Sequence, residues 1–164
     1  HSHDKKPPTM NQEELMREAI RLASANVENG GGPFGAVIAR GGEIIATGVN
    51  RVTANCDPTA HAEVSAIRAA AQKPGTFNLS GCEIYSSCEP CPMCLGAIYW
   101  ARLDRLFYGN TKADAARIGF DDAFIYKELA LPLSERTLRA EQLLGKEAIA
   151  TFEAWEQKTD KTPY

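Results

Sequence analysis

The chain has 164 residues, a mass of 17.8 kDa and a formal net charge of −3. Its 44% hydrophobic and 24% charged residues are typical of one soluble globular domain, which excludes a disordered or collagen-like chain. No apolar run approaches the roughly 20 residues of a membrane span, so no membrane partner is expected, and the acidic balance argues against a nucleic acid partner.

Residues 1–9 are polar and contain Pro7 and Pro8. They lack the apolar core of a signal peptide. We therefore interpret residues 1–9 as a flexible leader or a cloning remnant, with Met10 as the natural start, and residues 10–164 as a single domain.

The first third of that domain predicts a helix and a hairpin. Apolar side chains at helical spacing run through residues 12–29 and stop at the glycines of residues 30–32, as in an amphipathic helix with a glycine stop. Two β-rich runs, residues 35–39 and 43–49, flank a glycine-containing turn and indicate a hairpin. A polar loop is expected after it.

The rest of the domain alternates between strands and helices. We expect helices at residues 61–71, 90–100, 113–118, 122–129 and 145–157, and strands at residues 82–87, 103–108 and 137–143. Proline is tolerated in the first turn of the helix at residues 90–100. This alternation favours an α/β sheet with helices on both faces.

The five cysteines are the first chemical signal. Cys88, Cys91 and Cys94 follow one another at three-residue spacing, whereas a secreted disulfide scaffold spreads an even number along a shorter chain. A cytoplasmic protein with a metal or catalytic cluster fits this usage better.

A catalytic zinc site is the strongest interpretation of the cluster. His61 and Glu63 lie at one predicted helix start, and Cys91 and Cys94 lie on one face of another, where the helix dipole favours thiolates. One imidazole and two thiolates leave the fourth position of a tetrahedral zinc for water. Glu63, which is beside a ligand without being one, is suited to relay the proton of that water.

Three other interpretations remain open at this point. Cys91 and Cys94 alone resemble a redox pair. With Cys88, and with Cys82 or Cys56 as a fourth ligand, they resemble part of an iron–sulfur run. A structural zinc site would also take Cys88 as its fourth ligand. The combination of His-x-Glu with Pro-Cys-x-x-Cys favours instead the zinc deaminases that act on nucleobases.

The sequence resembles the cytidine deaminase-like superfamily and, within it, the bacterial guanine deaminases. The resemblance runs from Met10 to Tyr164, and its most specific stretches are residues 32–38, 57–64, 87–102 and 115–122. It implies a three-layer α/β/α sandwich on a mixed five-stranded sheet, with one zinc per chain. It also implies a homodimer that exchanges its C-terminal segments, so that Tyr164 reaches the pocket of the partner.

The same resemblance implies a set of contacts to a purine base. The edge of guanine presents two adjacent donors that one carboxylate can accept, and Asp122 holds the matching position. Asn50 matches a purine-contacting asparagine, and Phe34 and Trp100 are aromatic residues suited to stacking. Each has a simpler alternative: a helix cap for Asp122, a turn residue for Asn50, and core packing for the two aromatic side chains.

These residues lead to one predicted reaction. We expect hydrolytic deamination of guanine to xanthine and ammonia, with Glu63 carrying the proton and backbone N–H groups near Ala62 and Cys91 holding the developing oxyanion. Within the superfamily, the rivals are a guanosine deaminase and a tRNA adenosine deaminase. Outside it, the rival is a non-catalytic zinc or redox protein, which would have no use for Glu63.

Overall fold

A computed structural model describes residues 9–164, so the expected leader lies, apart from Thr9, outside the described residues. The chain divides into two compact units, His1–Ala123 and Phe124–Tyr164. The first unit contains the sheet and all the predicted zinc ligands. No helix of the described residues has the length and apolar content to cross a membrane.

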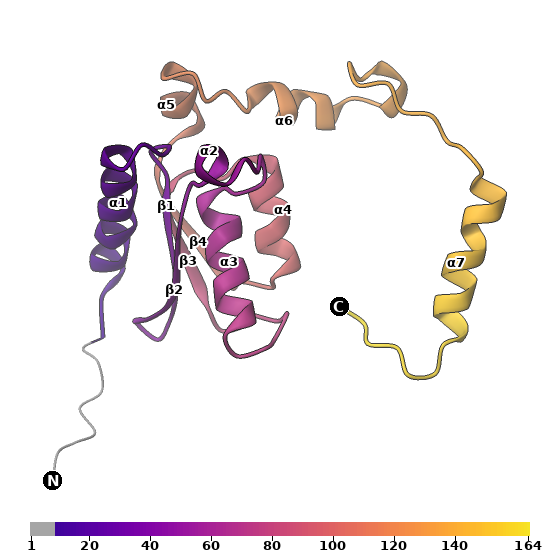
Figure 1. The fold of residues 1–164 in the computed structure, drawn as a ribbon, viewed down its shortest axis with the longest axis horizontal. Coiled ribbons are helices and arrows are strands. Elements are labelled where there is room, and N and C mark those ends of the chain that lie inside the picture. Colours follow the sequence, from indigo (N-terminus) through magenta and orange to yellow (C-terminus); the bar gives the residue numbers. More distant parts are fainter. Residues whose placement is uncertain (1–8) are drawn as a thin grey trace, which may run out of the picture. The chain divides into compact units, whose positions relative to one another are not determined.

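The first unit is built on a mixed sheet in the order β2-β1-β3-β4 (Figure 1). Strand β1 runs antiparallel to β2 and β3, and β3 runs parallel to β4. The strands are β1 (Gly35–Arg40), β2 (Glu43–Val49), β3 (Glu83–Cys88) and β4 (Arg105–Asn110). The predicted hairpin and the predicted central strands are therefore present.

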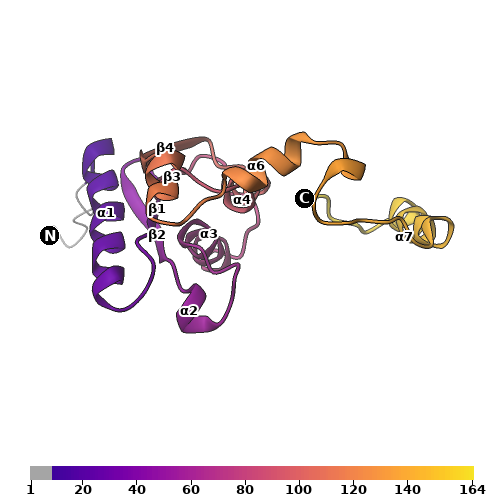
Figure 2. The same cartoon turned by 90° about the horizontal axis from the view of Figure 1, so that it is seen from above.

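Helices cover both faces of this sheet, as expected for an α/β/α sandwich. Helix α1 (Gln12–Glu28) packs on one face, and α3 (Ala62–Gln72) and α4 (Pro92–Trp100) lie on the other (Figure 2). Strand β1 supplies both cores because its side chains alternate between faces: Ile38 faces α3, and Val37 faces α1. Shorter helices are α2 (Val52–Asn55) and α5 (Lys112–Arg117).

Helix α1 begins and ends where its sequence indicates. Asn11 and Glu14 form a reciprocal capping box at the start. At the other end Gly30 has a φ of 85°, and Gly31 N–H donates to the carbonyl of Asn26 over 2.8 Å. This is a Schellman ending, which only a residue tolerant of positive φ permits at Gly30.

Strand β2 fixes the position of α3 through backbone contact. A Cβ atom on Gly48 would overlap the carbonyl of Ala62 and the amide of Ala66, so the strand and the first turns of α3 touch without a side chain between them. Because His61 is the N-cap residue of α3, this contact also places His61.

The second unit lacks a core of its own. Its elements are α6 (Ala123–Ala130), the 3₁₀ turn η1 (Leu133–Glu135) and α7 (Gly145–Gln157), and none of them contains a buried residue. Large apolar side chains stay exposed, among them Leu138, Phe152 and Leu144.

Two expectations about the fold were wrong. The strand at residues 137–143 does not form, and the sheet has four strands rather than five. A strand exists only through hydrogen bonds to a neighbour, and the second unit contains no other strand among its residues. The loop after β2, expected to be irregular, contains the short helix α2.

Candidate metal centre and active site

Two helix starts bring three metal-binding side chains together. His61 and Cys91 are the N-cap residues of α3 and α4, and Cys94 lies in the first turn of α4. The ligand atoms of His61, Cys91 and Cys94 all lie within 4.8 Å of one another. His61 Nδ1 is 3.5 Å from the Sγ atom of each cysteine.

The spacing of this ligand group fits zinc. A tetrahedral zinc with Zn–N and Zn–S bonds of about 2.0 and 2.3 Å separates nitrogen from sulfur by about 3.6 Å. The observed separations of 3.5 Å match that value. Among the described residues no fourth protein ligand joins the group, which is the pattern of a catalytic site with one open position.

Cys88 lies outside the ligand group. It is buried, its Sγ is 4.0 Å from the carbonyl oxygen of Thr111, and burial raises its pKa to about 11. The group of side chains that could hold a metal ion among the described residues does not include this sulfur. The iron–sulfur and four-ligand alternatives, which both need Cys88, lose support.

The electrostatics of the site favour thiolate at Cys91. The side chain and the backbone N–H of Cys94 both donate to Cys91, and with the nearby His61 they lower the pKa of Cys91 to about 4. Donating to Cys91 and burial raise the pKa of Cys94. The negative Cys91 in turn raises the pKa of His61. The positive ends of the two helix dipoles favour the thiolate form of both cysteines.

Glu63 lies in the first turn of α3, beside the ligands and outside their group. Its side chain is only 6% exposed, and burial raises the pKa of its carboxyl. A carboxyl group that retains a proton closer to neutral pH is suited to both accept and return one. This is the environment expected of a general acid–base next to a metal-activated water.

The predicted purine contacts Phe34 and Asp122 lie in segments that meet at the site. The Phe34 ring packs edge-to-face on Phe120, with centroids 5.0 Å apart. Asp122 follows Phe120 closely in sequence, and burial and the negative charge of Cys91 raise the pKa of its carboxyl. Asp121 rather than Asp122 accepts a hydrogen bond from Ala123 N–H, so the capping role proposed for this pair falls to Asp121. Sequence reasoning overlooked Phe120 itself.

Three other predicted residues have different placements. Ala62 is fully buried at the start of α3. Trp100 is at the opposite end of α4 from Cys91, about 13 Å away at the rise of a helix, and its ring is beside Arg102. Within a single chain, Trp100 therefore lies away from the ligand group. Tyr164 belongs to the second unit.

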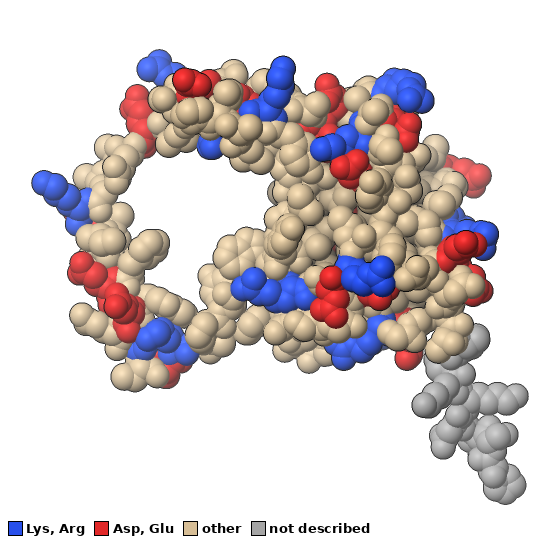
Figure 3. Space-filling view, turned by 180° about the vertical axis from the view of Figure 1, so that it is seen from behind, with Lys and Arg blue, Asp and Glu red and all other residues tan. Residues whose placement is uncertain are grey.

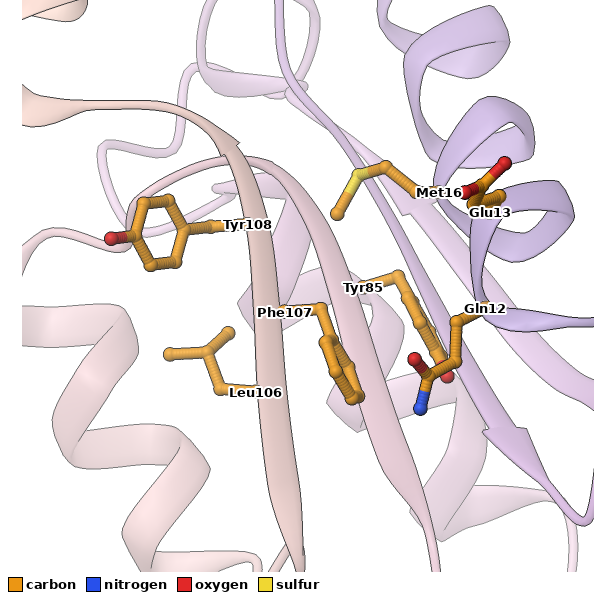
Figure 4. Close-up of a pocket in the computed structure, with 7 residues that line it drawn as sticks. All are labelled: Gln12, Glu13, Met16, Tyr85, Leu106, Phe107 and Tyr108. Carbon is orange, nitrogen blue, oxygen red and sulfur yellow. The ribbon is translucent and has the colours of Figure 1, made fainter.

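A separate cavity of about 320 Å³ lies on the α1 side of the sheet (Figure 4). Its lining includes Met16 from α1 and the stacked pair Tyr85 and Phe107, whose rings are 4.8 Å apart. Since α3 and α4 lie on the other face, this cavity is apart from the ligand group and plays no part in the site.

The family is identified by its zinc-binding region. Residues 9–110 match the model of the cytidine and deoxycytidylate deaminase zinc-binding region, which includes His61, Glu63, Cys91 and Cys94. This chain belongs to that deaminase family. Its members are enzymes, and the α/β architecture of the first unit agrees with theirs.

Among individual deaminases, the chain is similar to the guanine deaminase of Bacillus subtilis. The two are 52% identical over 94% of this chain and 100% of the relative, and the solved structure superposes with a TM-score of 0.91, covering 94% and 99% of the two chains. A solved structure in complex with 2,6-diaminopurine is 34% identical, with a TM-score of 0.68 over 74% of this chain and 68% of the other.

The chain is also similar to a tRNA-specific adenosine deaminase of Aquifex aeolicus. The identity is 40% and covers 60% of this chain and 66% of the relative. The two relatives therefore differ in how much of this chain they match.

The ligand group leads to a prediction about metal content. Cys91→Ser and Cys94→Ser should each lose zinc, because each removes one of three ligands. Cys88→Ser should retain one zinc per chain, since its sulfur is outside the group. Metal analysis of the purified proteins measures this, with the exposed Cys56→Ser as a control. Loss of zinc from Cys88→Ser would contradict the three-ligand site.

Proposed function

We propose that this chain catalyses the hydrolytic deamination of guanine to xanthine and ammonia with one zinc ion. The observation that carries the proposal is the group of His61, Cys91 and Cys94 beside the buried Glu63, in a chain that matches a guanine deaminase over nearly its whole length. In the reaction, a C–O bond forms and the C–N bond to the exocyclic amine breaks.

His61, Cys91 and Cys94 would hold the zinc, which when bound would act as a Lewis acid and make a water molecule nucleophilic near neutral pH. Glu63 takes one proton from that water and gives it to the ring nitrogen. It then moves the second proton of the same oxygen to the exocyclic amine, which leaves as ammonia. Backbone N–H groups at the starts of α3 and α4, near Ala62 and Cys91, stabilise the oxygen on which charge develops.

The purine is recognised by groups around the ligands. Asp122 accepts from the two adjacent donors of the guanine edge, which adenine and cytosine do not offer together. Phe34, braced by Phe120, provides an aromatic surface. Asn50 donates from its amide, since its Oδ1 already accepts from Val52 N–H over 3.2 Å. Guanosine presents the same edge and remains the second candidate substrate.

A tRNA substrate is less well supported. The similarity to the tRNA-specific adenosine deaminase of Aquifex aeolicus covers 60% of the chain, whereas that to a guanine deaminase covers 94%. On the face shown in Figure 3, acidic and basic side chains are interspersed rather than gathered into a basic surface. Backbone binding of tRNA would favour such a surface.

A homodimer with exchanged C-terminal segments is part of the proposal. The second unit has no buried residue in its elements, so its apolar side chains need a surface to cover them. Helix α4 is apolar almost all round, yet Tyr99 and Trp100 are 72% and 64% exposed. An exchanged segment would cover both surfaces and bring Tyr164 to the partner's pocket.

A cytoplasmic location completes the proposal. All five cysteines are free thiols in the structure, and oxidising compartments favour their pairing.

The proposed role of Glu63 is tested by Glu63→Gln. This variant keeps the shape of the side chain but cannot carry the proton, so ammonia release from guanine should fall at least about 100-fold. General acid–base catalysis typically contributes about 100- to 10,000-fold to the rate. Zinc should remain at one per chain, because Glu63 is not a ligand. Retention of more than a tenth of the activity would remove Glu63 from the mechanism.

The exchanged segment is tested by complementation. A chain lacking residues 161–164 should fold and bind zinc yet turn over guanine slowly, because water enters the open pocket. Co-refolded with Glu63→Gln chains, it should regain activity: in the mixed dimer, the truncated chain supplies Glu63 and receives the intact tail of its partner. Full activity of the truncated chain, or no rescue in a verified mixed dimer, would rule out the exchange.

A further inference from the structure

Asn26 is a buried polar residue for which the mechanism above has no role. It lies in the last turn of α1 and is 9% exposed. Its Nδ2 group donates two hydrogen bonds of 2.8 Å, one to the carbonyl of Gly32 and one to the carbonyl of Asn50. One side-chain amide therefore ties together two segments that are far apart in sequence.

Both segments carry a proposed purine contact. Phe34 N–H donates to the same Gly32 carbonyl over 2.8 Å, and Asn50 N–H donates to the carbonyl of Phe34 over 3.2 Å. The Asn26 amide is thus hydrogen-bonded directly to the backbone of Asn50, and it shares the Gly32 carbonyl with the backbone N–H of Phe34. Within the described residues, Asn50 Nδ2 donates no hydrogen bond to the protein, so this end of the half-buried amide is open to a ligand or to water.

The glycine loop after α1 is shaped around these two amides. A Cβ atom on Gly31 would overlap the side chain of Asn26, and one on Gly32 would lie 3.2 Å from the Asn50 amide carbon and 3.4 Å from the Phe34 ring. Gly31 N–H also donates to the backbone carbonyl of Asn26 over 2.8 Å. The loop can therefore shift only if Asn26 and Asn50 shift with it.

We propose that Asn26 is a positioning residue for purine recognition, which acts by fixing the backbone of Asn50 and Phe34. This inference rests on the proposed function, because Asn50 and Phe34 are contacts of the purine. Two convergent donors on a short, planar group are needed here. Aspartate has the same shape and, when ionised, no donor, while serine has one.

The consequence is a change in substrate handling rather than only in stability. If the carbonyls of Gly32 and Asn50 lose the Asn26 amide as a donor, Asn50 and Phe34 are held by fewer hydrogen bonds, and misplacement by about 1 Å can cost on the order of 100-fold in rate. A merely structural role would lower the amount of folded enzyme, which reduces the apparent kcat and leaves KM unchanged.

The test is a double-mutant cycle on the zinc-loaded full chain, with guanine as substrate. Asn26→Asp should raise KM and lower kcat/KM by about 10- to 100-fold, with one zinc per chain retained. In an Asn50→Ala background the same change should cost at least about threefold less than in the wild type, because one of the two contacts that Asn26 positions is gone. Asn29→Ala, at the exposed end of the same helix, should leave both constants unchanged.

Each result decides the proposal. Equal losses from Asn26→Asp in both backgrounds, or an unchanged KM, would overturn the positioning role while leaving the proposed function intact. An inactive wild-type enzyme would overturn both. If Asn26→Asp does not fold, Asn26→Ser, which keeps one donor, is tested instead. It should lower kcat/KM by a smaller factor, and this loss should again be smaller in the Asn50→Ala background.

Discussion

The meeting of two helix N-termini is the constraint on which the rest of the site depends. His61 is the N-cap residue of α3 and Cys91 is the N-cap residue of α4, so the first N–H groups of both helices lie beside the ligand group. Those groups, and the positive ends of the two dipoles, stabilise thiolate and developing negative charge. The backbone contact between Gly48 and α3 holds one of these ends in place. Burial of Glu63 is then useful, because the raised pKa of its carboxyl suits proton transfer.

Sequence reasoning reached the parts of the structure that local chemistry determines. The glycines after α1 predicted its ending, and the spacing of Cys91 and Cys94 with His61 predicted the ligand group that the structure assembles. Contacts between distant segments were beyond it. The strand expected at residues 137–143 needed a neighbour that its unit does not contain. The predicted helix at residues 90–100 already put Trp100 at the opposite end from Cys91, so its aromatic character alone was a weak reason to expect a contact with the purine.

The residues that orient the substrate contacts were the least visible in the sequence. Asn26 occurs in a helical pattern, where an asparagine attracts no attention, and only the fold shows that its amide bridges Gly32 and Asn50. Phe120 was within the stretch that suggested guanine, yet its contact with Phe34 depends on how β1 and the segment after α5 meet. The proposed purine contacts therefore depend on long-range packing, whereas the ligand residues lie in two short motifs of the sequence.

The most direct test of the account is ammonia release by the zinc-loaded wild-type protein from guanine, guanosine, adenine and cytosine, compared as kcat/KM. The carboxylate of Asp122 next to the ligand group predicts that guanine exceeds adenine and cytosine by at least about 100-fold, since a pocket built to pair two donors rejects rings that lack them. Equal rates on adenine or cytosine, or no release from guanine, would contradict the account.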